Sequence, residues 1–224
     1  IVVDISEQDS ERPEMQLYKS LHSFQIDKKF VIGFSAVIAI LMGISESVNW
    51  ENILIYLNRV SYGINDPVFN QDVGFYLFNL QFYEYIRNWM AFAIGFILVV
   101  VLIVYIAKRA VRLENRKLSI DPPVKFHLSL LLGIYLLLQA AAFWINARKI
   151  LYSTAGAVYG AGYTDIHINL LAFRISMILC IIAAVIILIT SRQESIRLPI
   201  ISIAAIFIVY IVLGGVLPGI IQRV

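Results

Sequence analysis

Residues 170–190, LLAFRISMILCIIAAVIILIT, form an uninterrupted apolar run whose single charged residue is Arg174. A helix needs about 20 apolar residues to cross the roughly 30 Å of hydrocarbon in a bilayer, because each residue advances it by about 1.5 Å. A backbone in hydrocarbon must also satisfy its own hydrogen bonds. The run therefore predicts a membrane-spanning α-helix.

Four further apolar segments predict spans, at about 30–50, 89–107, 126–145 and 198–217. The first is the weakest, because only Phe30–Ile44 is continuously apolar and it must run on through Glu46 to Trp50 to reach spanning length. A short buried helix is the alternative there. The expected fold class is an all-α integral membrane protein with about five transmembrane helices. Residues 1–29 would be a cytoplasmic leader or inter-span loop, and residues 30–224 the transmembrane domain.

Composition supports this class and excludes others. The 224 residues are 60% hydrophobic and 15% charged, whereas soluble domains are about half apolar and about a quarter charged. The net charge is only +3, and the bases are not interleaved with stacking aromatic residues, so no nucleic-acid partner is expected. The lone cysteine, Cys180, cannot form an intrachain disulfide and is interpreted as a small core residue.

The basic residues between the spans indicate an orientation, since cytoplasmic loops carry the excess of Lys and Arg. The leader and the second and fourth connections hold twelve bases, whereas the segments on the other side hold five. The bias has the same sign at every connection. We therefore expect the N-terminus of this chain on the cytoplasmic side and its C-terminus on the extracytoplasmic side.

The first outer loop, between Glu46 and Asn88, is too long for a simple turn. Its first part, SVNWENILIYLNRV (residues 47–60), repeats apolar residues at helical spacing and predicts a short helix along the outer membrane surface. Its second part, residues 62–85, is dense in aromatic side chains, which suit the headgroup zone. An aromatic belt is the simpler interpretation. The alternative is a platform that binds lipid, glycan or a partner.

The second outer connection, STAGAVYGAGYTDIHIN (residues 153–169), holds three glycines and two titratable side chains. Three glycines within seven residues favour a tight, irregular backbone. Thr164 and Asp165 directly precede the 170–190 helix, and both are favourable N-cap residues. A carboxylate at a helix N-terminus is stabilised by about 0.3–1 kcal/mol, so we expect Asp165 to cap this helix.

A charged residue within a span is costly. On insertion scales the cost is at least about 2.5–3.5 kcal/mol at the centre and less near an end, where Arg174 lies. It lies roughly one turn inside the outer boundary, from which its side chain could snorkel to the interface. Asp165, His167 and Arg174 form a candidate polar cluster, since His167 would share a helix face with Arg174. A partner carboxylate would come from Asp165, Glu46 or Glu84. The alternatives are a structural ion pair between spans and an anion or substrate site.

No metal or cofactor site is indicated. The three histidines, His22, His127 and His167, lack ligand spacing, and there are no paired cysteines. The sequence also lacks a P-loop, a nucleophile elbow and a dinucleotide-binding glycine pattern. We expect no cofactor and no metal.

Two loop stretches, YGINDPVFNQDVGFYLFNLQFY (62–83) and LYSTAGAVYGAGYTDIHINLLAFR (151–174), resemble the bacterial multi-pass membrane proteins of Uncharacterised Protein Family 0182. The family's Asp-Pro-x-Phe, Asp and Phe-Tyr pattern is matched by Asp66, Pro67, Phe69, Asp72, Phe75 and Tyr76. Its glycine-rich core is matched by Gly160, Ala161, Gly162, Tyr163, Thr164 and Asp165. Pro218 and Gln222 match the end of its membrane region.

The resemblance implies that this chain is part of a longer protein of the bacterial cell membrane. Such proteins have seven spans followed by a large extracytoplasmic domain, so the first two spans and that domain would be missing here. The implied partners are the lipid bilayer and the outer domain of the same protein. The resemblance implies no activity, and the sequence indicates no oligomeric state.

The favoured function is a non-enzymatic, membrane-embedded domain that anchors an outer domain and communicates with it. One alternative is a transporter or channel subunit with an outer vestibule near Asp165 and Arg174. Mid-span helix interruptions would favour transport, and the spans lack them apart from Gly214-Gly215 and Pro218 near the end of the last. The other alternative is a membrane enzyme that acts on lipid or glycan at the outer face.

Overall fold

Within the part of the chain that the computed structural model describes, four helices are long and apolar enough to span a membrane. The structure describes residues 28–108, 110–114, 117–152, 160–163 and 165–191. The described helices are α3 (Lys28–Glu46), α4 (Trp50–Leu57), α5 (Leu80–Ala107), α6 (Pro122–Lys149) and α7 (Leu170–Thr190). The turn Ser47–Asn49 joins α3 to α4, so that these two helices together make one of the four long elements.

Two of the long helices begin with a π-helical turn. The turn Phe75–Asn79 leads into α5, and the turn Asp165–Asn169 leads into α7. At its C-terminal end, α6 continues into a 3₁₀ turn, Ile150–Tyr152. A short antiparallel hairpin of β1 (Val111–Glu114) and β2 (Lys117–Ile120) connects α5 to α6.

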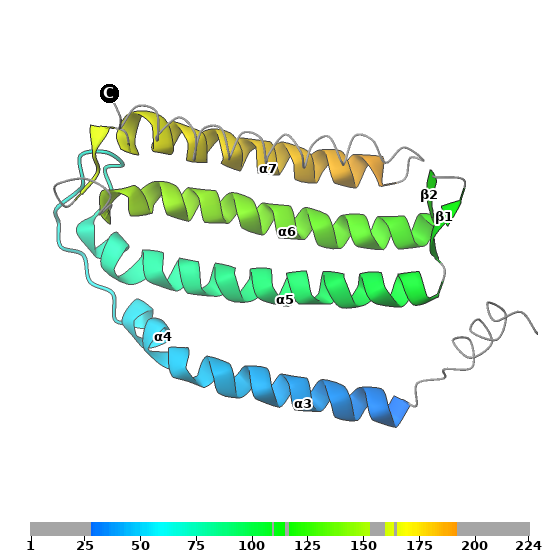
Figure 1. The fold of residues 1–224 in the computed structure, drawn as a ribbon. Coiled ribbons are helices and arrows are strands. Elements are labelled where there is room, and N and C mark those ends of the chain that lie inside the picture. The colour runs from blue at the N-terminus through cyan, green and yellow to red at the C-terminus, as the bar shows by residue number, and fades with distance from the viewer. Residues whose placement is uncertain (1–27, 109, 115–116, 153–159, 164, 192–224) are drawn as a thin grey trace, which may run out of the picture.

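The helices α5, α6 and α7 lie side by side in chain order, and α3 lies beyond α5, away from α6 (Figure 1). The most extensive contact is between α6 and α7, followed by that between α5 and α6. The end of α3 is tied to α5 by the Tyr85 hydroxyl, which donates to Glu46 Oε2 at 2.8 Å. The ring of Tyr56 in α4 stacks on that of Phe82 in α5, at a centroid distance of 4.2 Å. The loop between α4 and α5 therefore lies at the opposite end of the layer from the hairpin (Figure 1).

Small side chains allow α6 and α7 to approach closely. Gly133, Ala140 and Ala147 are buried at spacings of seven residues along α6, and α7 buries Ser176, Ala183 and Thr190 at the same spacing. Seven residues are close to two helical turns, so each set stays on one face of its helix. Closely packed small residues are typical of helix interfaces in membranes.

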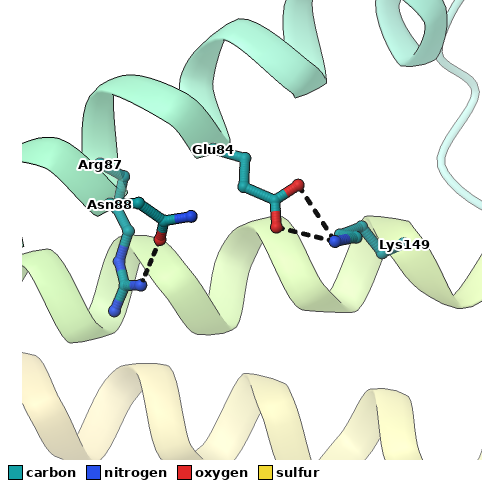
Figure 2. A network of polar contacts seen from close by, with 4 residues as sticks. All are labelled: Glu84, Arg87, Asn88 and Lys149. Atoms are coloured by element: carbon teal, nitrogen blue, oxygen red, sulfur yellow. Dashed lines mark hydrogen bonds and ion pairs between the residues drawn. The ribbon is translucent and has the colours of Figure 1, made fainter. Parts of the chain in front are cut away.

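Polar contacts join α5 to α6 near the same end as the α4–α5 loop. Figure 2 shows Lys149 of α6 beside Glu84 of α5, where Nζ and Oε1 are 2.7 Å apart. One turn further along α5, Arg87 donates to the Leu138 carbonyl at 3.0 Å and to the Gln139 amide oxygen at 2.5 Å. Its third donation is to its neighbour Asn88 (Figure 2). Carbonyl and amide oxygens, rather than a carboxylate, satisfy this inward-facing charge.

The sequence prediction of a mainly helical fold is confirmed, and helices cover four of the five predicted spans. The fifth, 198–217, lies outside the described residues, as does the leader up to residue 27. A short helix after the first span is confirmed as α4. The loop predicted between Glu46 and Asn88 is helical over its last part, because the π-helical turn begins at Phe75 and α5 at Leu80. The predicted span begins later, at residue 89, because Glu84 and Arg87 make the preceding segment less apolar. Both side chains find partners on α6.

The small-residue contact leads to the first prediction. Ala183 is 2% exposed, so Ala183→Leu inserts three carbons into a filled contact and should destabilise the protein by about 1–3 kcal/mol. Thermal unfolding in detergent, followed by circular dichroism, measures this loss. The matched control is Ala36→Leu on the exposed surface of α3, which should leave the midpoint unchanged. Equal midpoints for both variants would show that α6 and α7 do not depend on this contact.

Candidate functional site

The two sequence motifs lie at the same end of the helical layer. Val68 and Phe69 of the α4–α5 loop and Ala161 of the α6–α7 connection pack on one core cluster, whose buried members are Ala147, Ile150 and Leu170. The loop and the ends of α6 and α7 are thus one packed unit. This packed unit is the candidate site, because it contains most of the motif residues and two arginines.

Asp66 organises the first half of the loop. Its Oδ1 accepts hydrogen bonds from the backbone N–H groups of Val68 at 2.8 Å and Phe69 at 2.6 Å. Its Oδ2 accepts from the N–H of Gln71 at 2.9 Å and from the Tyr76 hydroxyl at 2.7 Å. Burial would raise the pKa of Asp66, but these four hydrogen bonds together hold it below its ordinary value. Asp66 is therefore an ionised structural acceptor.

Asp72 organises the second half in the same way. Its carboxylate accepts from the Ser61 hydroxyl at 2.6 Å and from three backbone N–H groups, those of Tyr62, Gly63 and Gly74, at 3.1, 2.8 and 2.6 Å. The Ser61 hydrogen bond is the largest cause of a lowered pKa, and the backbone donors help to bring it to about 2. Asp72 ties the start of the loop to the first turn before α5.

Between the two aspartates, Pro67 opens a turn over residues 67–69, and Asn70 takes a positive φ of 53°. Asparagine tolerates this left-handed conformation better than most residues. Tyr76 is 5% exposed and packs with Leu80 and Ile145, while the ring of Phe75 meets that of Trp144 edge-on at 6.2 Å. The motif residues thus fasten the loop to α6.

Arg148, near the end of α6, is held between two rings. The carbon of its guanidinium lies 3.5 Å from the centre of the Trp144 ring and 5.4 Å from that of Phe69. Its Nη1 donates to the Trp144 carbonyl at 3.1 Å, and its Nε is buried without a hydrogen-bond partner among the described residues. Cation–π contacts fix the position of this charge, and no carboxylate among the described residues is paired with it.

Arg148 and Arg174 line one pocket, which we call the arginine pocket. It has a volume of about 170 Å³, and its other lining residues are Phe69, Phe143, Trp144, Ala147, Phe173 and Met177. Arg174 is exposed and makes no hydrogen bond or ion pair with any described residue. The pocket therefore combines two positive charges with an apolar wall.

The prediction that Asp165 caps α7 is wrong. Asp165 is the first residue of the π-helical turn, and its Oδ2 accepts from the N–H of Gly162, which precedes it, at 3.0 Å. Its Oδ1 accepts from the Asn169 side chain at 2.9 Å. The residue before α7 is Asn169, which makes no side-chain cap. The carboxylate therefore binds residues that precede α7, because the π-helical turn Asp165–Asn169 lies between Asp165 and the first residue of α7.

No hydrogen bond or ion pair between described residues joins Asp165, His167 and Arg174, the candidate polar cluster. Asp165 is buried and occupied, whereas His167 is exposed and lies against the ring of Tyr163 at a centroid distance of 4.2 Å. Arg174 faces the arginine pocket instead, and none of Asp165, Glu46 or Glu84 is its ion-pair partner. Gly160 has a φ of 118°, which favours glycine. Thr164 lies outside the described residues.

Sequence reasoning missed Arg148, which was counted only as a loop base. Its signal was present: Arg148 follows Trp144 by four residues, the spacing that places two side chains on one helix face. The missing information was the partner helix. Only the fold shows that Arg148 and Arg174, 26 residues apart, line the same pocket.

The three aspartates of the motifs are occupied as hydrogen-bond acceptors. Asp66, Asp72 and Asp165 accept two to four hydrogen bonds each, so none is poised as a general acid or base. Within the described part of the chain, no group of three His, Cys, Asp or Glu side chains could hold a metal ion. Two arginines in an apolar pocket fit an anion.

Comparison with known proteins matches this chain to a protein family. The model of an uncharacterised protein family, UPF0182, matches residues 3–224. A UPF0182 protein of Desulforamulus reducens is 35% identical over 189 residues, which are 84% of this chain and 20% of that protein. One of Thermobifida fusca is 30% identical over 88% of this chain and 19% of its own length. The chain spans about a fifth of the length of these curated relatives, and no solved structure matches it.

Gly74 provides a test of the loop architecture. A Cβ at this position would lie 2.2 Å from the Val60 carbonyl oxygen and 2.8 Å from Asp72 Oδ1, so Gly74→Ala must open the loop. We expect trypsin to cleave after the exposed Arg59 several-fold faster in this variant. Gly43→Ala, where a Cβ meets nothing within 4 Å, is the control. Unchanged cleavage in Gly74→Ala would show that the loop does not need this close approach.

Acid should release the Asp72 contacts only at low pH. The folded pKa of about 2 lies below the ordinary 3.8, so the stabilisation is fully present above about pH 4 and is lost as the pH falls towards 2. A spin label at Ile64, attached through Ile64→Cys in a Cys180→Ala protein, should become mobile over that interval. With Asp72→Asn the label should already be more mobile at pH 7. A release centred above pH 4 would contradict this assignment, provided that circular dichroism shows intact helices.

Proposed function

Because this chain belongs to the uncharacterised protein family UPF0182 and covers only 15–21% of its curated relatives, we propose that it is a membrane-embedded domain that anchors the rest of the full-length protein. The outward-facing apolar surface carries this proposal. Residues such as Ile40, Phe92 and Ile103 are 62%, 62% and 60% exposed. An apolar surface of this extent requires a cover, and helices of spanning length fit a bilayer.

The proposed arrangement has five spans in the bacterial cell membrane, with 198–217 as the fifth. The end with the α4–α5 loop and residues 160–163 faces the extracytoplasmic side, and the β1–β2 hairpin faces the cytoplasm. The excess of bases in the hairpin connection supports this orientation. In this arrangement α4 and the exposed rings of Trp50 and Tyr62 lie in the outer headgroup zone.

Coupling to an outer domain would use the packed unit at the extracytoplasmic end. A loop fixed by eight hydrogen bonds to the carboxylates of Asp66 and Asp72 is a stiff surface for a second domain. The transporter alternative needs a vestibule shared by Asp165 and Arg174, but no described contact joins them. The enzyme alternative needs free acidic groups, but those of the motifs are hydrogen-bonded.

Cysteine labelling tests the orientation. In the full-length protein, with Cys180→Ala and any other cysteines replaced, Tyr163→Cys and Lys108→Cys place exposed thiols at the two ends of the helical layer. A membrane-impermeant maleimide added to intact cells should label position 163 and not position 108. Permeabilised cells should show both, which serves as the control. Equal labelling in intact cells, or release of the protein by an alkaline carbonate wash, would overturn the proposed embedding.

A further inference from the structure

We propose that the arginine pocket binds the phosphate of an anionic lipid headgroup. The proposal rests on the membrane embedding proposed above and goes beyond anchoring, because it gives one end of the domain a specific ligand. Four observations support it. The two guanidinium groups have unused N–H donors, no described carboxylate is paired with them, the pocket has apolar walls, and Arg148 lies near the end of its helix.

The donors are numerous and largely unused. A guanidinium carries five N–H donors, and Arg148 uses one of them, from Nη1 to the Trp144 carbonyl, among the described residues. Arg174 uses none there. The rings of Trp144 and Phe69 hold the Arg148 guanidinium in place, so little side-chain freedom remains to be lost when a ligand binds. Two arginines at one pocket suit a phosphate, whose oxygens accept paired N–H groups.

Among the described residues, no carboxylate is a hydrogen-bond or ion-pair partner of Arg148 or Arg174. Asp66 acts electrostatically on Arg148, but its oxygens are occupied by four donors within the loop. Asp165 is occupied by Gly162 and Asn169, and Glu84 is paired with Lys149. Among the described residues the two arginines of the pocket therefore have no paired counter-ion, and an anion from outside the chain would supply one.

The walls and the position favour a lipid over a free ion. Phe143, Phe173 and Met177 give the pocket an apolar side, and the exposed Ile178 and Ile181 continue an apolar surface along α7. Arg148 lies one turn before the end of the α6 element at Tyr152. In the proposed orientation this is the outer headgroup level, at which lipid phosphates lie. A phosphate would then meet the arginines while its acyl chains cover the apolar surface.

The test uses the full-length protein in a nonionic detergent and measures bound lipid by native mass spectrometry. The probes are dioleoyl-phosphatidylglycerol, dioleoylglycerol, which has the same chains without phosphate, and inorganic phosphate. We expect phosphatidylglycerol to bind and dioleoylglycerol to bind at least about tenfold more weakly, since hydrogen bonds to charged groups are lost. Inorganic phosphate at the same concentration should not displace the lipid.

Variants locate the site. Arg174→Gln, on an exposed side chain that should not affect folding, should weaken phosphatidylglycerol binding about tenfold or more. Arg148→Gln should do the same, and Arg174→Lys should retain part of the affinity because the charge remains. The matched control is Arg59→Gln, an exposed arginine of the same end that is not a lining residue of the pocket, and it should bind like the unmodified protein.

Three results would overturn the proposal. These are equal affinity in Arg174→Gln, equal binding of dioleoylglycerol, and displacement of the lipid by inorganic phosphate, which would assign the pocket to a soluble anion. None of them affects the labelling pattern at positions 163 and 108. Failure of the pocket and failure of the membrane embedding are therefore separate observations.

Discussion

The close contact between α6 and α7 positions everything at the end of the layer that carries the motifs. Helices in a bilayer gain little from burying apolar side chains, because lipid is as apolar as leucine, and they associate through close packing instead. The buried small residues of α6 and α7, spaced by seven, permit that packing over the length of both helices. As a consequence, Arg148 on one helix and Arg174 on the other line the same pocket.

The aspartates of the first motif have a structural role that residue type alone does not indicate. The loop has only one isolated backbone bridge, between Asn65 and Asp72. Most of its other backbone N–H groups that form hydrogen bonds donate to the two carboxylates, each of which accepts four hydrogen bonds. Asp66 and Asp72 divide the loop between them, and Tyr76 links the first of them to the helix core. The same loop supplies Phe69 to the arginine pocket, so loop and pocket are built together.

The helices could be predicted from the sequence because length and apolar composition decide them, and α7 agrees with its predicted bounds. The start of α5 could not, since Glu84 and Arg87 are polar in the sequence and the partners they find on α6 are distant along the chain. The same reason explains the errors at the site. Asp165 has the residue type of an N-cap, but a π-helical turn separates it from α7. Arg148 and Arg174 are distant in the sequence, and their shared pocket depends on helix packing that no local pattern encodes.

The π-helical turns before α5 and α7 place an extra residue in the first turn of each helix. Each residue of an α-helix advances the side-chain direction by about 100°, so one inserted residue rotates everything before it relative to everything after it. Deleting a single residue from Asp165–Asn169 would restore regular winding and swing Gly160, Gly162 and Tyr163 about a quarter of the way around the axis of α7. In each case one residue therefore sets the rotation of the helix relative to the segment before it, and a one-residue deletion there would change the direction in which that segment faces.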